Sequence, residues 1–453
     1  MNLSDCKNLK NNQMNYSSII ILGIVIGGFI GLGSTTRGTD FFGLFFISIC
    51  CFIFMTLLFK VNDPVLKKVL IIAFALRTGL ALVQAFILSL PDSTMDAVGF
   101  ELTGWEIATA WNTGLEANFT IPHYATFIYT KIIGVIYFIS GRVPLLVQFV
   151  NVILGVLIVY YVYKIIIELG ATKRSAQIGS VITALFPTLC LYSVITLRET
   201  FVSFFVIVSV FYFFKWLNSG RVSKLVLTAA FLLLSSALFG AMIVIGVVYA
   251  IFFVFYEVKT KKWKLISKQS VLGIFIAILV IIIYGSFLLD KIPADIRLVF
   301  SPDYMGSRVT GAAKGGSTYL VGFTPNSILD IIIQSPVRMV YFLFAPFPWM
   351  ISSPDQILGL IDAFLYLVLV FYAIRGLKYL KKYNNPAFWA VISMLLIIIG
   401  TFAWGVSNFG TAVRHRQKIV GLIIAVSSLG ITRSWLAKWI LPRFKAKQRT
   451  KMI

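Results

Sequence analysis

Five carboxylates stand in and just after one loop of an otherwise apolar chain, and they could carry out acid–base chemistry. The loop, residues 91–106, lies between long apolar stretches. Asp and Glu side chains can accept a proton from a reacting hydroxyl group, and acids gathered in a membrane protein indicate a functional site. The five carboxylates are Asp92, Asp96, Glu101, Glu106 and Glu116.

Aromatic residues alternate with the acids of this loop in a helical pattern. Phe100 and Trp105 are interleaved with Glu101 and Glu106. Such rings are suited to stacking on sugars or to lying at a lipid interface. Asp96 precedes the pattern, so a second interpretation is that its carboxylate caps the helix.

A cluster of opposite charge follows much later, within residues 408–418. It contains Arg414, His415 and Arg416, with Lys418 at its end. Arg pairs with phosphate oxygens through two parallel hydrogen bonds, and a neighbouring His can donate another hydrogen bond or a proton. Because cations are uncommon on the outer side of a membrane, we expect this cluster to bind an anion. The anion is either a substrate phosphate or an outer-leaflet lipid headgroup.

Three more charged residues interrupt the apolar runs. The turn at residues 191–200 places Arg198 next to Glu199. These two residues either pair with each other to lock the turn or contribute to a site. Arg77 lies well inside an apolar run, near Gln84. Since an unpaired charge is costly in lipid, we expect Arg77 to face the interior of a helical bundle, toward a structural or a substrate partner.

The composition places these residues in a polytopic membrane protein. The chain is 59% hydrophobic and only 13% charged, which is too apolar for a soluble fold of this length. Its net charge of +23 arises from Lys and Arg in short connections between apolar runs. This is the distribution of cytoplasmic connections, so the charge indicates topology and not nucleic-acid binding. We interpret the first apolar run as a retained helix and not as a signal peptide.

We predict an all-α bundle, a single membrane domain over residues 1–453, with about 12 spans and both termini in the cytoplasm. Residues 124–140 and 337–350 are also apolar, but counting either alone as a crossing would put basic connections outside. We predict that both are interfacial or re-entrant helices at the outer face. The outer segments are then 91–142, 290–356 and 406–418. The predicted spans are 18–33, 41–59, 69–90, 143–163, 176–196, 199–217, 225–239, 241–256, 269–289, 357–374, 386–406 and 417–432.

Other motifs indicate no further chemistry. The four cysteines have neither the spacing of a disulfide framework nor that of a metal site. The Gly-rich stretch at residues 306–318 lacks the Gly-Lys pair of a phosphate-binding loop, and we interpret it as a surface loop.

Four segments together resemble the GT-C superfamily of membrane glycosyltransferases, including its members in O-antigen and exopolysaccharide assembly. The segments are residues 92–101, 192–200, 341–349 and 408–416, and the similarity extends over most of residues 70–430. Enzymes of this type use polyprenyl-linked sugars. The resemblance therefore implies a multi-pass protein of a bacterial inner membrane, whose active face is extracytoplasmic and whose partners are the lipid-linked glycan, the bilayer and other assembly proteins.

The resemblance also implies roles for the charged residues. Asp96 is the expected general base on the acceptor hydroxyl of an inverting reaction, with Asp92 and Glu101 as the other catalytic candidates. The expected ligands of the leaving phosphate are Arg414, His415, Arg416, Arg198 and Lys418. The expected supporting residues are Glu199, Glu106, Trp105 and Arg77. No cofactor is required, and metal dependence stays open because no acidic pair stands beside Asp96.

Two roles within this family remain open at the level of sequence. The chain either transfers one sugar from a polyprenyl-phosphate donor or polymerises repeat units carried on polyprenyl pyrophosphate. The alternative of another class is a flippase or transporter of lipid-linked oligosaccharide or polysaccharide. Transporters usually carry charges near the middle of several spans, whereas nearly all the predicted spans here lack them.

Overall fold

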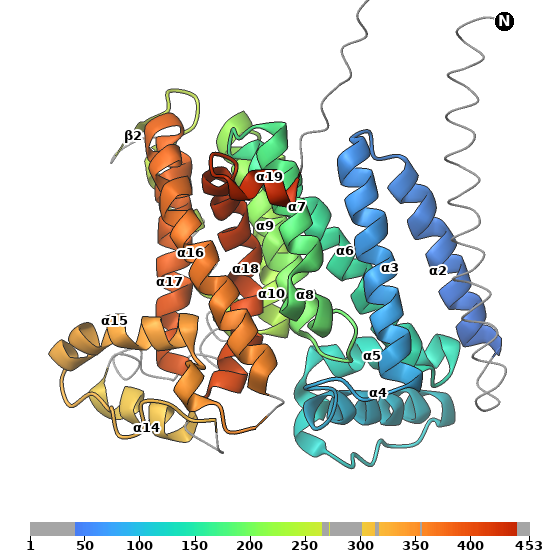
Figure 1. Ribbon diagram of the computed structural model, residues 1–453. Helices are drawn as coiled ribbons and strands as arrows, with labels where there is room; N and C mark the ends of the chain where they lie inside the picture. The colour runs from blue at the N-terminus through green and yellow to red at the C-terminus, as the bar shows by residue number, and fades with distance from the viewer. Residues whose placement is uncertain (1–40, 265–270, 272–300, 313–316, 354–355, 442–453) are drawn as a thin grey trace, which may run out of the picture. The chain divides into compact units, whose positions relative to one another are not determined.

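The described part of the chain is almost entirely helical. The computed structural model describes residues 41–264, 271, 301–312, 317–353 and 356–441 (Figure 1). In that part, the only strands form a small antiparallel hairpin of β1 (Tyr256–Glu257) and β2 (Lys262–Trp263). The prediction of an all-α protein is therefore confirmed. The chain divides into two compact units: unit 1 comprises Met1–Val156 and Leu191–Arg198, and unit 2 comprises Leu157–Cys190 and Glu199–Ile453.

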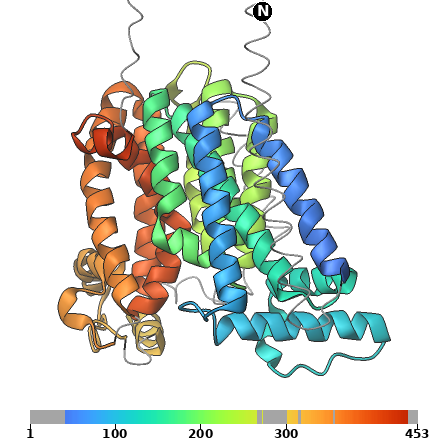
Figure 2. The same ribbon diagram turned by 45° about the vertical axis from the view of Figure 1, so that its right-hand side comes forward.

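The described part of unit 1 is made of helices of different lengths. In two views of the unit, α4 lies across the end of α3 (Figures 1 and 2). The start of α3 is set by Asp63, whose carboxylate accepts hydrogen bonds from two backbone amides, and by Pro64 in the first turn. The elements of unit 1 are α2 (Phe41–Phe59), α3 (Pro64–Phe86), α4 (Asp96–Thr113), η1 (Pro122–Thr126), α5 (Ile128–Ser140) and the first part of α6 (Pro144–Glu168).

Unit 2 is built around α18, of which every residue from Arg416 to Ile431 is buried. Helix α16 approaches α18 closely because Gly376 has no side chain: a Cβ there would lie 2.0 Å from the carbonyl oxygen of Val426. The helices of unit 2 are the rest of α6, α7 (Lys173–Leu185), α8 (Pro187–Tyr192), which ends in unit 1, α9 (Glu199–Ser219), α10 (Val222–Leu238), η2 (Gly240–Val244), α11 (Ile245–Phe255), α14 (Pro302–Ala312), α15 (Ile328–Phe344), η3 (Pro348–Met350), α16 (Ile357–Tyr383), α17 (Asn385–Gly405), α18 (Phe409–Ile431) and α19 (Leu436–Ile440).

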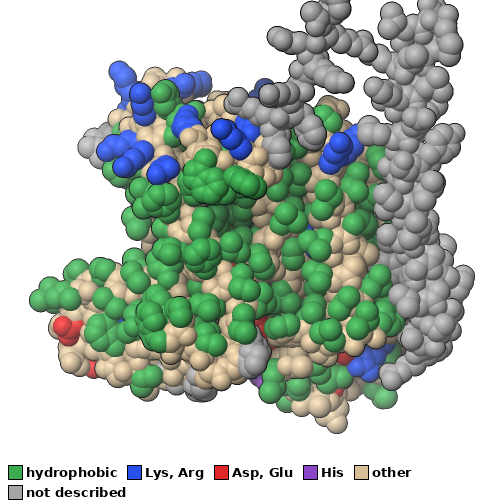
Figure 3. Space-filling model, in the orientation of Figure 1, with side chains coloured by type: hydrophobic (Ala, Val, Ile, Leu, Met, Phe, Trp, Pro, Cys, Tyr) green, Lys and Arg blue, Asp and Glu red, His purple; other side chains and the backbone are tan. Residues whose placement is uncertain are grey.

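Five described helices, α3, α6, α9, α16 and α17, are long and apolar enough to cross a membrane. Helix α16 exposes large apolar side chains such as Phe364 and Leu367, as a helix in lipid does. Lys and Arg side chains of unit 2 gather at the end that bears β2 and α19 (Figure 3). These features are consistent with a membrane protein. The predicted total of about 12 spans stays a prediction. Residues 18–33 and, except for Val271, residues 269–289 lie outside the described residues.

Two predicted elements differ from the structure: a span is interrupted, and a connection is mostly helical. The span expected at residues 176–196 is divided into α7 and α8 at Phe186, which has an extended backbone. The residue before a proline disfavours the helical conformation, and Pro187 follows. The outer connection expected at residues 406–418 is mostly helical, since α18 already begins at Phe409. Asn408 caps it by accepting a hydrogen bond from the amide of Thr411.

The two apolar segments predicted to lie at the membrane interface are helical. Residues 124–140 form the end of η1 and all of α5, and residues 337–350 form the end of α15 and η3. Within unit 2, α15 runs crosswise to α16 and α17 (Figure 1). That either helix lies at the interface of a membrane stays a prediction.

Candidate functional site

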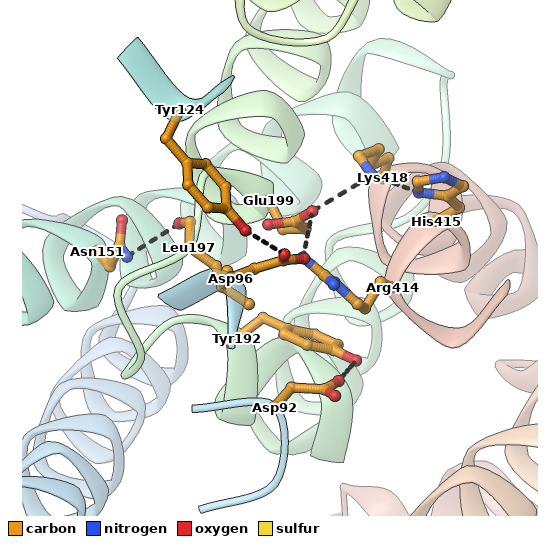
Figure 4. A network of polar contacts seen from close by, with 10 residues as sticks. All are labelled: Asp92, Asp96, Tyr124, Asn151, Tyr192, Leu197, Glu199, Arg414, His415 and Lys418. Atoms are coloured by element: carbon orange, nitrogen blue, oxygen red, sulfur yellow. Dashed lines mark hydrogen bonds and ion pairs between the residues drawn. The ribbon is translucent and has the colours of Figure 1, made fainter. Parts of the chain in front are cut away.

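The carboxylate of Asp96 lies at the start of α4 and accepts a hydrogen bond from the hydroxyl of Tyr124 at 2.5 Å (Figure 4). Tyr124 fits over this helix because Gly99 leaves room: a Cβ there would lie 2.2 Å from the tyrosine ring. The capping interpretation of Asp96 is wrong in the structure, because Met95 is the N-cap residue of α4 and makes no side-chain cap. The Asp96 carboxylate is instead held by an aromatic hydroxyl.

The backbone before Asp96 adopts uncommon conformations. Met95 has φ 44° and ψ −104°, and Asp92 has φ 60°. Residues other than Gly rarely occupy this half of the map, and such strain is most often retained where function requires a fixed geometry. The strain is compatible with a functional role for the loop that carries both aspartates.

Asp92 is fixed by a different tyrosine. Its Oδ2 accepts a hydrogen bond from the hydroxyl of Tyr192 at 2.7 Å (Figure 4). The segment after Tyr192 is held in turn by the buried side chain of Asn151, which donates to the carbonyl oxygens of Ile195 and Leu197 at 2.7 and 3.2 Å. The loop before α4 and the turn at residues 191–198 are thereby joined within unit 1.

Arg198 ends this turn against two aromatic rings of unit 1. Its guanidinium carbon lies 4.4 Å from the centre of the Phe127 ring and 5.7 Å from that of Phe100. Stacking of this kind orients a guanidinium. The geometry is compatible with the predicted phosphate contact.

Glu101 and Glu106 are engaged in contacts of the α4–α5 region. Glu101 accepts two hydrogen bonds from Arg142, at 3.0 and 2.8 Å, and one from Tyr137 at 3.0 Å. The hydrogen bond with Glu101 raises the pKa of Arg142. Glu106 accepts hydrogen bonds from the amide and hydroxyl of Thr120. These contacts favour structural roles for both acids.

Trp105 belongs to the same region. Its ring lies 5.9 Å from the guanidinium carbon of Arg142 and edge-on to Tyr137 at 6.2 Å. A tryptophan placed in this way packs the two helices together, which is compatible with the predicted supporting role.

The basic cluster of unit 2 lies on one face of α18. Lys418 follows Arg414 by four residues and His415 by three, so its side chain neighbours both on this face. Arg414 and Lys418 lie against Glu199, the first residue of α9, and His415 lies beside Lys418 (Figure 4). The Glu199 carboxylate lies 3.5 Å from Arg414 and 3.9 Å from Lys418. The Glu199 side chain is only 3% exposed and that of Lys418 is fully buried, whereas the Arg414 side chain is 21% exposed. Arg414 is therefore the cation of this group that reaches the surface.

The ring of His415 has a defined orientation, and its contact with Lys418 favours one tautomer. Phe239 and Phe402 flank it, with ring centres 5.1 and 4.9 Å away. The Nζ of Lys418 lies 2.7 Å from the Nδ1 of His415. When Lys418 is protonated it can only donate, so that Nδ1 accepts and a neutral ring carries its proton on Nε2. His415 can therefore donate a hydrogen bond from Nε2.

This tautomer can be observed directly by nitrogen NMR. The chain contains two histidines, so a His123→Gln variant leaves His415 as the single labelled ring. We expect a protonated Nε2 and an unprotonated Nδ1 at neutral pH. Removing the donor with Lys418→Met should allow both tautomers. A ring that carries its proton mainly on Nδ1 in the presence of Lys418 would contradict the assignment.

Arg416 faces away from this cluster. It is fully buried, its Nη1 donates to the carbonyl oxygen of Leu343 at 2.6 Å, and its Nη2 lies 3.2 Å from Asp362 of α16. Asp362 also accepts a hydrogen bond from Thr188 at 2.7 Å. With these partners, Arg416 is placed to join helices of unit 2, and we do not include it among the proposed phosphate ligands.

Arg77 is fully buried in unit 1, as predicted for a charged residue facing a bundle interior. Its Nη1 donates to the carbonyl oxygen of Ala73 at 3.3 Å. A Cβ on Gly155 of α6 would lie 3.1 Å from its Nε, so this glycine makes room for the guanidinium. The contacts of Arg77 indicate a role in packing.

Sequence reasoning did not identify Tyr124, Tyr192, Asn151 and Asp362, which orient the candidate residues. Tyr124 is 28 residues from Asp96, and Tyr192 is 100 residues from Asp92.

In the described residues, no group of three or more His, Cys, Asp or Glu side chains could hold a metal ion. No family model, no curated protein and no solved structure matches this chain.

Proposed function

We propose that the chain is a membrane glycosyltransferase of bacterial surface polysaccharide assembly. It acts on polyprenyl-phosphate-linked or polyprenyl-pyrophosphate-linked saccharides at the extracytoplasmic face of the cytoplasmic membrane. The observation that carries the proposal is the cluster of Glu199, Arg414, His415 and Lys418. A buried carboxylate holds two cations at fixed positions, and a histidine with a defined N–H group lies beside them. Donors fixed in advance in this way are suited to a phosphate whose charge grows as it leaves.

Asp96 supplies the other half of the proposed chemistry. Its carboxylate removes the proton from the acceptor hydroxyl, whose oxygen then forms a bond to the anomeric carbon of the donor sugar. The bond between that carbon and the lipid phosphate breaks, and the phosphate keeps the electron pair. Attack from the face opposite the leaving group inverts the anomeric configuration. Arg414 offsets the charge of the departing phosphate, and the Nε2–H of His415 donates a hydrogen bond to it.

Within this class, the chain is either a repeat-unit polymerase or a single-sugar transferase. The small, all-helical build of the described residues, with the crosswise helices α4 and α15, slightly favours a polymerase that holds a long glycan. A flippase or transporter is the second candidate. It is supported by the buried pair of Arg416 and Asp362, because charges buried among membrane helices often mark a transport path.

The surface glycan of a deletion strain distinguishes these possibilities. For a polymerase we expect chains that end after one repeat unit, and for a single-sugar transferase an altered or truncated repeat. Both can be read from gel profiles and from glycan mass spectrometry, with the gene restored on a plasmid as the control. An unchanged glycan would contradict the proposal. Accumulation of complete lipid-linked oligosaccharide on the cytoplasmic side would support a flippase instead.

A further inference from the structure

The α4–α5 region of unit 1 contains a surface pocket that is separate from the aspartates of the candidate site. Its volume is about 320 Å³. This is near the lower limit of about 300 to 1,000 Å³ for pockets that bind small molecules, so it suits part of an alkyl chain better than a whole lipid. The pocket is lined by Ile107, Ala110, Trp111, Leu115, Ala117, Phe119, Ala125 and Lys131.

The lining of this pocket is apolar except for Lys131. Its walls are formed by aromatic and aliphatic side chains, and the alanines leave the space between them. A free sugar or a free phosphate would find one polar side chain, Lys131, in this lining and would leave most of its hydrogen-bonding groups without a protein partner. The lining therefore favours a ligand with a hydrocarbon part, which gains from the removal of apolar surface from water.

The pocket adjoins an exposed apolar stripe on α5. Ile128, Val135, Phe138 and Ile139 are 40% to 61% exposed, and their spacing places them on one face of the helix together with the exposed Lys131. Trp111, which lines the pocket, packs edge-on against Phe138 at 6.2 Å. A continuous apolar surface of this kind is suited to lipid and unfavourable in water.

Lys131 is the cation among the residues that line the pocket, so it favours a ligand with a negatively charged group. In the described part of the chain it forms no ion pair, and it is exposed at the edge of the pocket. A lysine binds phosphate as a point charge, while its aliphatic stem lies along apolar surface. We propose that this pocket binds an anionic phospholipid, with the end of one acyl chain among the apolar residues and the phosphate on Lys131.

This lipid site is independent of the proposed transferase activity, and photochemical crosslinking to lipids tests it. A benzophenone amino acid replaces Leu115, a lining residue that is 71% exposed at the mouth of the pocket, in the full chain, which is reconstituted in vesicles of equal parts phosphatidylglycerol and phosphatidylcholine. We expect phosphatidylglycerol adducts to exceed phosphatidylcholine adducts by about fivefold, the preference that one lysine near a membrane surface provides. The same amino acid at Leu367, an exposed position on α16, should give both adducts equally.

Two variants separate the charge from the pocket. Lys131→Gln should lower the adduct ratio at Leu115 to the value at Leu367, since it removes the charge at an exposed position. Ala110→Phe should fill the pocket and reduce all lipid adducts at Leu115, with the melting temperature in detergent as the test of folding. Equal adducts at Leu115 in the unaltered pocket would overturn the proposal. Crosslinks to the protein itself would also overturn it, since another part of the chain would then fill the pocket.

Discussion

Asp96→Asn is expected to abolish the glycan product while the amount of protein in the membrane stays unchanged. The amide keeps the size of the side chain and can still accept the hydrogen bond of Tyr124, but it cannot take a proton from the acceptor. Loss of a general base typically lowers the rate by about 100-fold to 10,000-fold. The measurement is the surface glycan of a deletion strain that carries the variant, together with quantification of the protein in the membrane fraction.

Two variants of the same region serve as controls for Asp96. Glu106→Gln neutralises another acid of α4, one that accepts hydrogen bonds from Thr120, and we expect nearly normal product. Tyr124→Phe leaves the Asp96 carboxylate in place and removes the hydroxyl that orients it, so we expect a loss of about tenfold, as for a positioning hydrogen bond of about 1.4 kcal/mol. Normal product from Asp96→Asn would exclude this residue as the base.

The sequence contains enough information to predict which way the residues of the basic cluster face. Asn408 is a preferred capping residue, and a helix that starts there puts Arg414, His415 and Lys418 on one face and Arg416 on another. Treating residues 406–418 as a connection obscured this division. Helical spacing alone separates the other phosphate candidates of this segment from Arg416.

The partners of these residues could not be predicted in the same way. Glu199 and Arg414 are 215 residues apart, and Thr188 and Asp362 are 174 apart. Contacts over such separations depend on how apolar helices pack, and the apolar residues of this chain are too uniform to specify one register. The helical fold was easier to predict from the sequence than these contacts. Hydropathy and the local effects of Asp63, Pro187 and Asn408 determine where several helices begin or end.

Arg414→Ala is expected to lower glycan product by about 100-fold to 1,000-fold, the usual effect of removing one donor that stabilises a developing charge. Arg414 is the cation of its cluster that reaches the surface, and Glu199 and the helix fix its position. Arg414→Lys should retain part of the activity, because lysine keeps the charge but loses the planar fork. Lys438→Ala on α19 removes an exposed cation elsewhere in unit 2 and should leave the product normal.

A double variant shows whether the acidic and basic clusters serve one reaction. If Asp96 and Arg414 act in the same chemical step, the double variant Asp96→Asn, Arg414→Ala should have nearly the same residual activity as the less active of the two single variants. The reason is that the effects of substituting groups that act together are strongly non-additive. If the clusters act in separate steps, the two losses should multiply. Residual transfer must be measured with purified protein and lipid-linked substrate, since cellular glycan is too insensitive at this level. Multiplying losses would contradict a shared step and leave Arg414 with a role in binding lipid alone.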